Sequence, residues 1–201
     1  MRLVFATNNA HKLDEVRRIL PQAIEVLSLR DIGFEADIVE DGDTLEANSR
    51  IKAEQVYAWL QEHGDRMEHI DGVFADDTGL EIAALGGQPG VYTARWAGEP
   101  ANDANNRAKA LRELQGKDDR SARFRTIVTL RMKGREAMQM DGEVRGRMAM
   151  HEQGDHGFGY DPLFMPEGYD KTFAQLPAEV KNTISHRANA MAKLKAKLEQ
   201  I

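Results

Sequence analysis

The chain of 201 residues contains no cysteine. Without thiols it cannot form disulfides, use a thiolate nucleophile or hold a cysteine-based zinc ion, and a reducing compartment poses no difficulty for it. Long apolar runs are also missing. The first run, Leu3 to Ala6, is far too short for the core of a signal peptide or for a membrane span. We therefore expect a cytoplasmic protein that does not enter a membrane.

Positive charge is not in excess either, because 33 acidic residues outnumber 27 lysines and arginines and leave a formal net charge of -6. A protein that binds nucleic acid by neutralising phosphates needs a broad basic face, so we expect no nucleic-acid partner. An RNA-binding module is accordingly a disfavoured alternative. A small polyphosphate is compatible with this balance, because a few lysines, backbone amides and a metal can hold it.

What is present is typical of a globular protein, with 41% hydrophobic and 30% charged residues. No repeat, low-complexity segment or linker interrupts the chain, so we predict a single domain over residues 1–201. The apolar spacing predicts strands at 3–6, 24–27, 72–75, 123–132 and 137–150, and helices at about 13–20, 44–62, 103–114 and from 185 onward. The last two strands form a hairpin near Lys133-Gly134, and residues 86–98 form an ordered loop. Antiparallel members indicate a mixed sheet in an α/β fold.

Two adjacent acids, Asp76 and Asp77, directly follow the predicted strand Gly72–Ala75. They are therefore expected at the carboxyl end of a buried strand, where ligand sites often lie. Magnesium typically binds one or two carboxylates together with substrate phosphates. Because neighbouring side chains of a strand point in opposite directions, only one acid should reach the metal and the other should support it. A solvated turn or a helix cap explains the pair equally well.

The segment Thr7–Lys12 is a polar loop between a predicted strand and a predicted helix. Free backbone amides at a helix N-terminus attract phosphate, and Lys12 adds a positive charge. An ordinary capped turn is the favoured alternative for this loop taken alone, because the chain has no GxxxxGK[ST] motif.

Two further polar segments lie toward the C-terminus. In Gly157–Pro162 (GFGYDP) the glycines let backbone approach a ligand, while Phe158 or Tyr160 offers a flat face for a nucleobase. A tight turn with core aromatics is the favoured alternative there. The donors of Lys181–Arg187 suit phosphate oxygens or base carbonyls, but a capped helix start explains them equally well.

Taken together and in this order, the motif-bearing stretches closely resemble the inosine/xanthosine triphosphate pyrophosphatase family of house-cleaning nucleotide hydrolases. They are ATNNAHKLDEV, ADDTGLEIAALGGQPGVYTARWAG, GFGYDPLFMPEGYDKTFAQL and KNTISHRANAM, and the likeness covers nearly the whole chain. The chain departs from the family at Asn8, where glycine is typical, at Thr78 and Thr93, where serine is typical, and at Trp96, where tyrosine is common. Asparagine tolerates a left-handed backbone and threonine keeps the hydroxyl, so activity is not put in doubt.

The resemblance implies an elongated mixed β-sheet with flanking helices that form two lobes around a central cleft, and a homodimer. It also implies Mg²⁺-dependent hydrolysis of ITP, dITP and XTP to the monophosphate and pyrophosphate, which prevents their incorporation into DNA and RNA. One alternative is a pyrophosphatase for other modified nucleotides, such as methylated pyrimidines. Another is a sensor that binds nucleotide without hydrolysis.

The resemblance also implies roles by motif position. Asp77 and Lys12 are the expected catalytic residues, with Asp77 binding magnesium and activating water. Glu40, in the acidic segment VEDGDT, is the expected second metal ligand, and Asp41 competes with it. The residues expected to cradle the triphosphate are Thr7, Asn8, Asn9, Ala10, His11 and Lys12. The other expected substrate contacts are Thr78, a base-binding wall of Phe158, Gly159, Tyr160 and Asp161, and the readers of the oxo edge of the purine, Lys181, His186 and Arg187.

Overall fold

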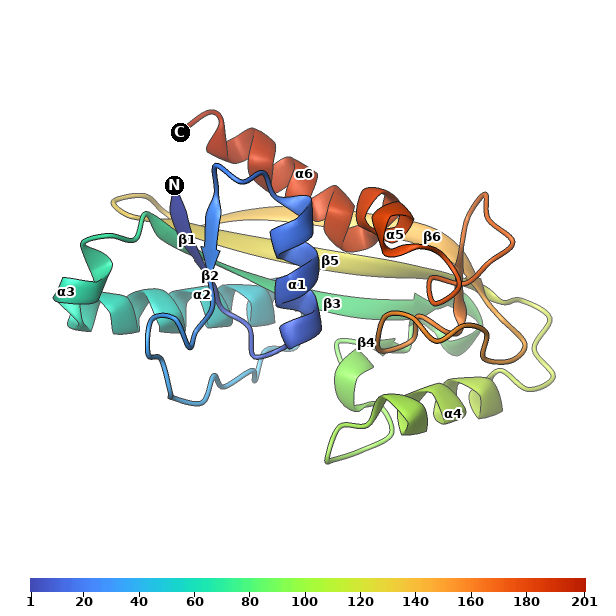
Figure 1. Cartoon of the computed structure of the whole chain (residues 1–201). Coiled ribbons are helices and arrows are strands. Elements are labelled where there is room, and N and C mark those ends of the chain that lie inside the picture. The colour runs from blue at the N-terminus through green and yellow to red at the C-terminus, as the bar shows by residue number, and fades with distance from the viewer. The chain divides into compact units, whose positions relative to one another are not determined.

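The computed structural model describes residues 1–201 (Figure 1). The strands are β1 (Arg2–Phe5), β2 (Glu25–Leu27), β3 (Gly72–Ile82), β4 (Pro89–Gly90), β5 (Ser121–Met132), β6 (Met138–Met148) and β7 (Phe164–Pro166). The helices are α1 (Ala10–Ile19), α2 (Leu45–Glu62), α3 (Gly64–Met67), α4 (Asp103–Glu113), α5 (Ala178–Ile184) and α6 (His186–Leu198). The elements predicted from apolar spacing are all present, and none of the helices is long and apolar enough to cross a membrane.

The strands form one seven-stranded sheet in the order β2-β1-β3-β5-β6-β7, with β4 added beside β3. β1 pairs in parallel with both β2 and β3. β4 is antiparallel to β3, and β7 is antiparallel to β6. The prediction of a mixed sheet in an α/β fold is therefore confirmed.

The chain divides into two compact units. The first contains residues 1–77, 126–142 and 190–201, and the second contains residues 78–125 and 143–189. The division crosses β3 at the peptide bond between Asp77 and Thr78.

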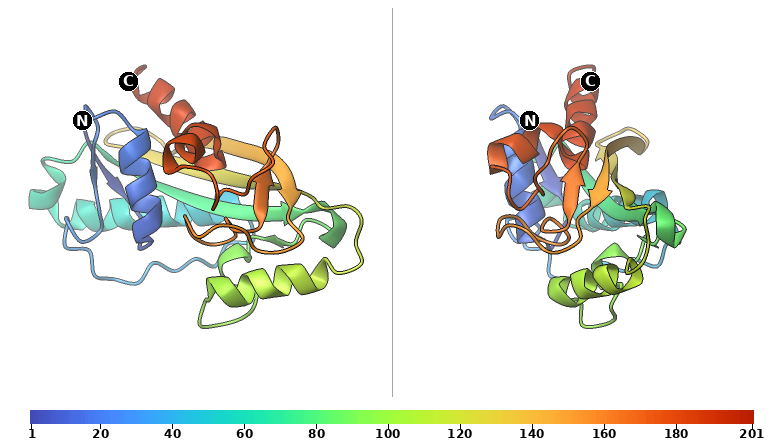
Figure 2. Two further views of the ribbon diagram at one scale, coloured as in Figure 1. Left: turned by 45° about the vertical axis from the view of Figure 1, so that its right-hand side comes forward. Right: turned by 90° about the vertical axis from the view of Figure 1, so that its right-hand side faces the viewer.

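The first unit has a core on each face of its part of the sheet. On one face, Phe5 and Phe74 stack with ring centroids 4.6 Å apart and pack with side chains of α1 and α6. On the other face, Val73 and Ala75 pack with α2. Figures 1 and 2 show α2 running along the face of β1 and β3 opposite to α1. Successive residues of β3 therefore face different helices, as the two-residue period of a strand requires.

The second unit has its own aromatic core. Leu80 and Ile82 of β3 pack with Ala110 and Leu114 of α4 and with a group of aromatic side chains. These aromatic residues are Phe124, Tyr160, Phe164 and Phe173. The loop between β6 and α5 thus contributes side chains to the core of this unit.

One sequence expectation about an element boundary needs correction. β3 does not end before the acids but continues to Ile82, so Asp76 and Asp77 lie within a strand. The parallel pairing with β1 ends at Phe5 and Phe74, while the buried pattern of β3 continues beyond it.

The last helix begins where the sequence predicts. Ser185 caps α6 through its hydroxyl, which accepts from the Ala188 amide at 3.1 Å. Lys181 lies before this cap, in the short helix α5.

Candidate active site

Asp76 and Asp77 project to opposite faces of β3, as expected from the strand period. The Asp76 carboxylate lies on the α1 side, where Oδ1 accepts from Lys12 Nζ at 2.9 Å. The Asp77 carboxylate lies on the α2 side, where Oδ1 is 3.5 Å from Lys52 Nζ. Each acid is thus matched by a lysine from a different helix. The unequal roles predicted for the pair have a structural basis in this division.

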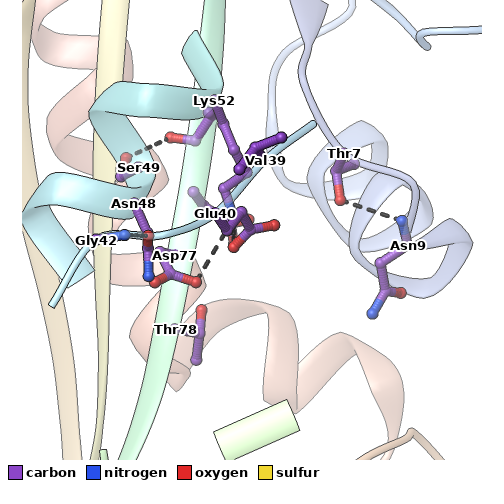
Figure 3. Close-up of polar contacts among 12 residues, drawn as sticks. Thr7, Asn9, Val39, Glu40, Gly42, Asn48, Ser49, Lys52, Asp77 and Thr78 are labelled. Atoms are coloured by element: carbon purple, nitrogen blue, oxygen red, sulfur yellow. Dashed lines mark hydrogen bonds and ion pairs between the residues drawn. The ribbon is translucent and has the colours of Figure 1, made fainter. Parts of the chain in front are cut away.

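The Thr7–Lys12 loop closes the first turn of α1. Thr7 Oγ1 accepts from the Asn9 amide at 3.1 Å (Figure 3), and Asn9 caps the helix by accepting from the Lys12 amide at 3.1 Å. This capping holds Lys12 at the helix start, and its ammonium reaches the buried Asp76. Asn8 of the loop is exposed, as are Ala10 and His11 in the first turn of α1. No residue other than glycine has a positive φ, so Asn8 does not use the left-handed backbone that its family substitution suggested.

Lys52 connects the second acid to the acidic loop. Its ammonium donates to Glu40 Oε2 at 3.2 Å and lies 3.5 Å from Asp77 Oδ1 (Figure 3). The Lys52 side chain is only 7% exposed, whereas that of Glu40 is 35% exposed. One buried cation therefore brings Glu40 and Asp77 together. Asp41 is exposed and has no such contact, which supports Glu40 over Asp41 as the partner of Asp77.

Lys52 is the functional residue that the sequence analysis missed. It lies in α2 on the buried stripe that also carries Leu45, Ser49 and Val56. A lysine in such a stripe is rarely buried unless it has an anionic partner. The position of Lys52 among the buried residues of the helix was therefore the sequence signal that could have indicated a carboxylate beside it. Ser49 keeps α2 close to β3 because its hydroxyl donates to the Ala75 carbonyl at 3.0 Å.

Burial and charge shift the pKa values of this cluster. Burial disfavours the Asp77 carboxylate and raises its pKa above the usual value, although Lys52 and Lys12 offset part of this effect. Burial alone would lower the pKa of Lys52. The surrounding carboxylates, Asp77 foremost, outweigh burial and hold that pKa above its usual value. Lys52 is therefore a permanent cation at neutral pH.

The residues around Asp77 fit a hard divalent cation. Asp77 Oδ2 is buried and has no hydrogen-bond partner, and such an oxygen normally binds either a donor or a metal. Magnesium accepts carboxylate oxygens and keeps water or phosphate as its other ligands. No group of three or more histidine or acidic side chains is arranged to hold a metal alone. A cation here would therefore share Asp77 and Glu40 with ligand oxygens.

The second unit gathers a different set of the predicted residues. Asp161 Oδ2 accepts from Lys181 Nζ at 2.7 Å and from the Phe158 amide at 3.0 Å. The same ammonium lies 4.8 Å from the centroid of the Phe158 ring, and the Arg187 guanidinium lies 6.0 Å from it. A half-buried aromatic face is thus flanked by two cations.

Thr78, His186 and Arg187 are held near this set. Arg187 is 1% exposed, and its Nη2 donates to Thr78 Oγ1 at 3.3 Å. The His186 ring stacks on Phe124 with centroids 4.7 Å apart. Buried donors of this kind suit a ligand with carbonyl oxygens.

Two members of the predicted base-binding wall have structural roles instead. Tyr160 is 3% exposed in the core of the second unit, and its hydroxyl donates to the Thr93 carbonyl at 2.7 Å. Its ring therefore offers no face to a ligand. Asp161 is 4% exposed and holds the loop through the Phe158 amide. Gly157 has φ +77°, and a Cβ there would collide with the Asp161 carboxylate, so glycine is required for this turn. Gly159 is fixed by Asp103, which accepts from its amide at 2.9 Å.

A mixed α/β sheet places two lysine-paired carboxylates beside a capped helix N-terminus. Groups of this kind are typical of proteins that bind phosphate together with a divalent cation. The chain belongs to the Ham1 family, whose family model matches residues 3–197. The resemblance seen in the sequence is thereby confirmed.

Individual relatives cover almost the whole chain. The dITP/XTP pyrophosphatase of Flavobacterium johnsoniae is 46% identical over 194 residues, which are 96% of this chain and 96% of that protein. The dITP/XTP pyrophosphatase of Bacillus subtilis is 44% identical over 199 residues, which are 98% of this chain and 96% of that protein. The solved structure of the Staphylococcus aureus Ham1 protein has a TM-score of 0.86 at 38% identity and covers 100% of this chain and 99% of its own.

Proposed function

We propose that this chain is a nucleoside-triphosphate pyrophosphatase that hydrolyses dITP, ITP and XTP to the monophosphate and pyrophosphate with Mg²⁺. The dITP/XTP pyrophosphatases to which it is similar support the substrate class. The observation that carries the proposal within the structure is the buried, unpartnered oxygen of Asp77 beside the Lys52 ammonium. A buried carboxylate oxygen without a hydrogen-bond donor destabilises the fold unless a ligand binds it.

The proposed chemistry divides among the side chains of the first unit. When bound, Mg²⁺ neutralises phosphate charge and polarises a phosphate oxygen. Lys12 and Lys52 add two positive charges for the triphosphate, while Asp77 accepts a proton from the attacking water. Asp77 suits this task because burial holds its pKa above the usual value. Glu40 is the proposed second carboxylate for the metal.

The proposed base recognition lies in the second unit. Phe158 offers the flat face, and Lys181, His186 and Arg187 supply donors for the oxo groups of hypoxanthine or xanthine. The 6-amino group of adenine would set a donor against these donors, and such a mismatch in a buried site is costly. Guanine keeps the 6-oxo group but adds a 2-amino group that needs its own acceptor. A homodimer and a cytoplasmic location complete the proposal.

The identity of the products tests the proposed reaction. With ITP in ¹⁸O-labelled water and Mg²⁺, we expect IMP and pyrophosphate, with the label in IMP if water attacks the α-phosphorus. The measurement is mass spectrometry of both products. Release of inorganic phosphate and IDP would contradict the proposed reaction. A protein that binds ITP but forms no product would instead be a sensor.

The substrate class has its own test. In a panel of ITP, dITP, XTP, ATP, GTP and dUTP, we expect the first three to be hydrolysed with kcat/KM at least about 100-fold above ATP and GTP, because mismatched hydrogen-bonding groups in a buried site typically give at least this discrimination. Equal rates for ITP and ATP would rule out the proposed base recognition. Preference for a modified pyrimidine would identify a related enzyme with a different base pocket.

A further inference from the structure

Glu40 lies in an irregular segment that has no secondary structure of its own. Residues 38–42 belong to neither a helix nor a strand, and Val39 is 58% exposed. An extended segment of this kind normally moves over a wide range, because little apolar surface holds it down. The Glu40 carboxylate nevertheless meets Lys52 at 3.2 Å. Ile38 packs against the core of the first unit at one end of the segment, and side chains of α2 hold the backbone on both sides of Glu40.

Gln55 holds the backbone on one side of Glu40. Its Oε1 accepts from the Val39 amide at 3.3 Å, and its Nε2 donates to the Val39 carbonyl at 2.9 Å. The backbone N–H and C=O of Val39 are thus both bonded to the side-chain amide of Gln55, as they would be to the backbone of a neighbouring strand. No other residue type on a helix supplies a donor and an acceptor with this spacing except asparagine, which is shorter.

Asn48 holds the backbone on the other side of Glu40. Its Oδ1 accepts from the Gly42 amide at 2.8 Å, and the Asn48 side chain is buried with 1% exposure (Figure 3). Gly42 also lies against the first turn of α2, where a Cβ would be 2.8 Å from both Ala47 Cβ and Asn48 Oδ1. The segment therefore passes so close to the helix that only glycine fits without displacement.

We propose that Asn48 and Gln55 are positioning residues that anchor the acidic segment at Val39 and Gly42 and thereby preset the Glu40 carboxylate for the metal. The proposal rests on the proposed function, in which Glu40 binds Mg²⁺. Two anchors on one rigid helix flank Glu40 closely, so its backbone cannot move away while both hold. Lys52 projects from the same helix, so one element aligns the carboxylate and its counter-ion. Neither anchor touches metal or substrate.

The physical reason for such anchors is the entropy of ordering. A carboxylate on a free loop must lose its conformational freedom each time the metal binds, and this cost weakens the affinity. Anchors that order the loop beforehand remove that cost. Side chains that orient metal ligands in this way typically account for about 10- to 100-fold in metal affinity or activity.

The test uses Gln55→Ala and Gln55→Glu in the full-length chain. Gln55→Glu keeps the acceptor for the Val39 amide but sets a carboxylate oxygen against the Val39 carbonyl, so it should also release this side of the segment. We expect the half-saturating Mg²⁺ concentration for pyrophosphate release to rise about tenfold in Gln55→Ala. The maximal rate at saturating Mg²⁺ should change much less. Gln61→Ala, an exposed glutamine of the same helix, is the matched control and should leave both values unchanged.

A second readout does not depend on activity. In the metal-free protein, the hydrogen exchange of the Val39 and Gly42 amides, measured by NMR, should speed up in Gln55→Ala while the β3 amides stay protected. Unchanged exchange at Val39 would contradict the anchor itself. Faster exchange throughout the first unit would mean general destabilisation and would also contradict a local anchor.

A double-mutant cycle decides whether the anchor acts through Glu40. If it does, adding Gln55→Ala to Glu40→Gln should raise the half-saturating Mg²⁺ concentration no further. Additive effects would overturn the proposal. A wild-type chain without Mg²⁺-dependent hydrolysis would sink the proposed function, whereas the exchange measurement would still report on the anchor.

Discussion

Asp77→Asn is expected to lower the turnover of ITP at least about 100-fold, because it removes both the proposed metal-binding carboxylate and the proposed proton acceptor. The amide is nearly the same size and cannot take the proton from water. The measurement is the steady-state rate of pyrophosphate release at saturating ITP and Mg²⁺. A rate within threefold of the wild type would exclude Asp77 as the base.

Thermal unfolding of Asp77→Asn is the control, because it shows whether the variant loses activity without losing its fold. Because burial raises the pKa of Asp77, the folded protein binds a proton there more tightly than the unfolded chain does. The free energy of unfolding therefore falls as the pH rises from the pKa of Asp77 in the unfolded chain through its pKa in the folded protein, because Asp77 ionises less readily in the folded state. Asparagine removes that loss of stability, so the metal-free variant should unfold at neutral pH at no lower temperature than the wild type. Thermal unfolding followed by circular dichroism checks this.

The same pKa shift predicts a pH dependence of the wild type when Mg²⁺ is limiting. Burial raises the pKa of Asp77 in the metal-free protein, and protons compete there with Mg²⁺, so the rate at a limiting Mg²⁺ concentration should fall as the pH decreases through a pKa above the usual value for aspartate. The residual activity of Asp77→Asn should lack this acidic limb. The measurement is kcat/KM for ITP as a function of pH, and an identical acidic limb in both proteins would assign the titration to another group.

Lys52→Met is expected to have the largest effect on stability. It removes a buried cation from between Glu40 and Asp77 and leaves carboxylates facing one another. Breaking a buried pair in this way should lower the free energy of unfolding of the metal-free protein by about 3 kcal/mol. For a chain of this size, the melting temperature should fall by roughly 6–12 °C. Turnover should also fall, because the triphosphate loses one cation.

A measurement with and without Mg²⁺ distinguishes repulsion between the carboxylates of Glu40 and Asp77 from simple loss of packing at residue 52. A divalent cation held by Glu40 and Asp77 restores positive charge and binds only the folded state, so it should recover part of the lost stability. Lys193→Met is the matched control. It removes an exposed ion pair with Asp141, worth at most about 1 kcal/mol, and Mg²⁺ should not alter its effect. A Lys52→Met protein destabilised equally with and without Mg²⁺ would contradict the shared cation site.

Much of the fold could be predicted because its signals are local. The continuous apolar runs of β1 and β3 and the helical spacing of α2 follow from which residues must be buried. The end of β3 could not be predicted in this way. In the sequence, two adjacent acids after an apolar run predict the end of a strand. In the structure, lysines from two helices pair with Asp76 and Asp77, so both carboxylates can be buried within the strand.

The candidate site was predicted unevenly for a related reason. The loop from Thr7 to Lys12 has a recognisable pattern, whereas Lys52 sits in an ordinary helix and gains its role only through partners distant in the sequence. The aromatic GFGYDP segment left two interpretations open, a flat face for a base from Phe158 or Tyr160 and a tight turn with core aromatics. The fold buries Tyr160 in the core and leaves Phe158 partly open.

The pair Asp76 and Asp77 shows which properties of the protein depend on the sequence alone and which depend on the tertiary structure. The sequence by itself determined the family, the order of the elements, the mixed sheet and the opposite directions of these two side chains, because all of these depend on residue type and spacing along the chain. Only the tertiary structure decided that Asp76 meets Lys12 from 64 residues away and that Asp77 meets Lys52. The strength of a buried charge depends on what surrounds it in space, and chain packing alone brings those surroundings together.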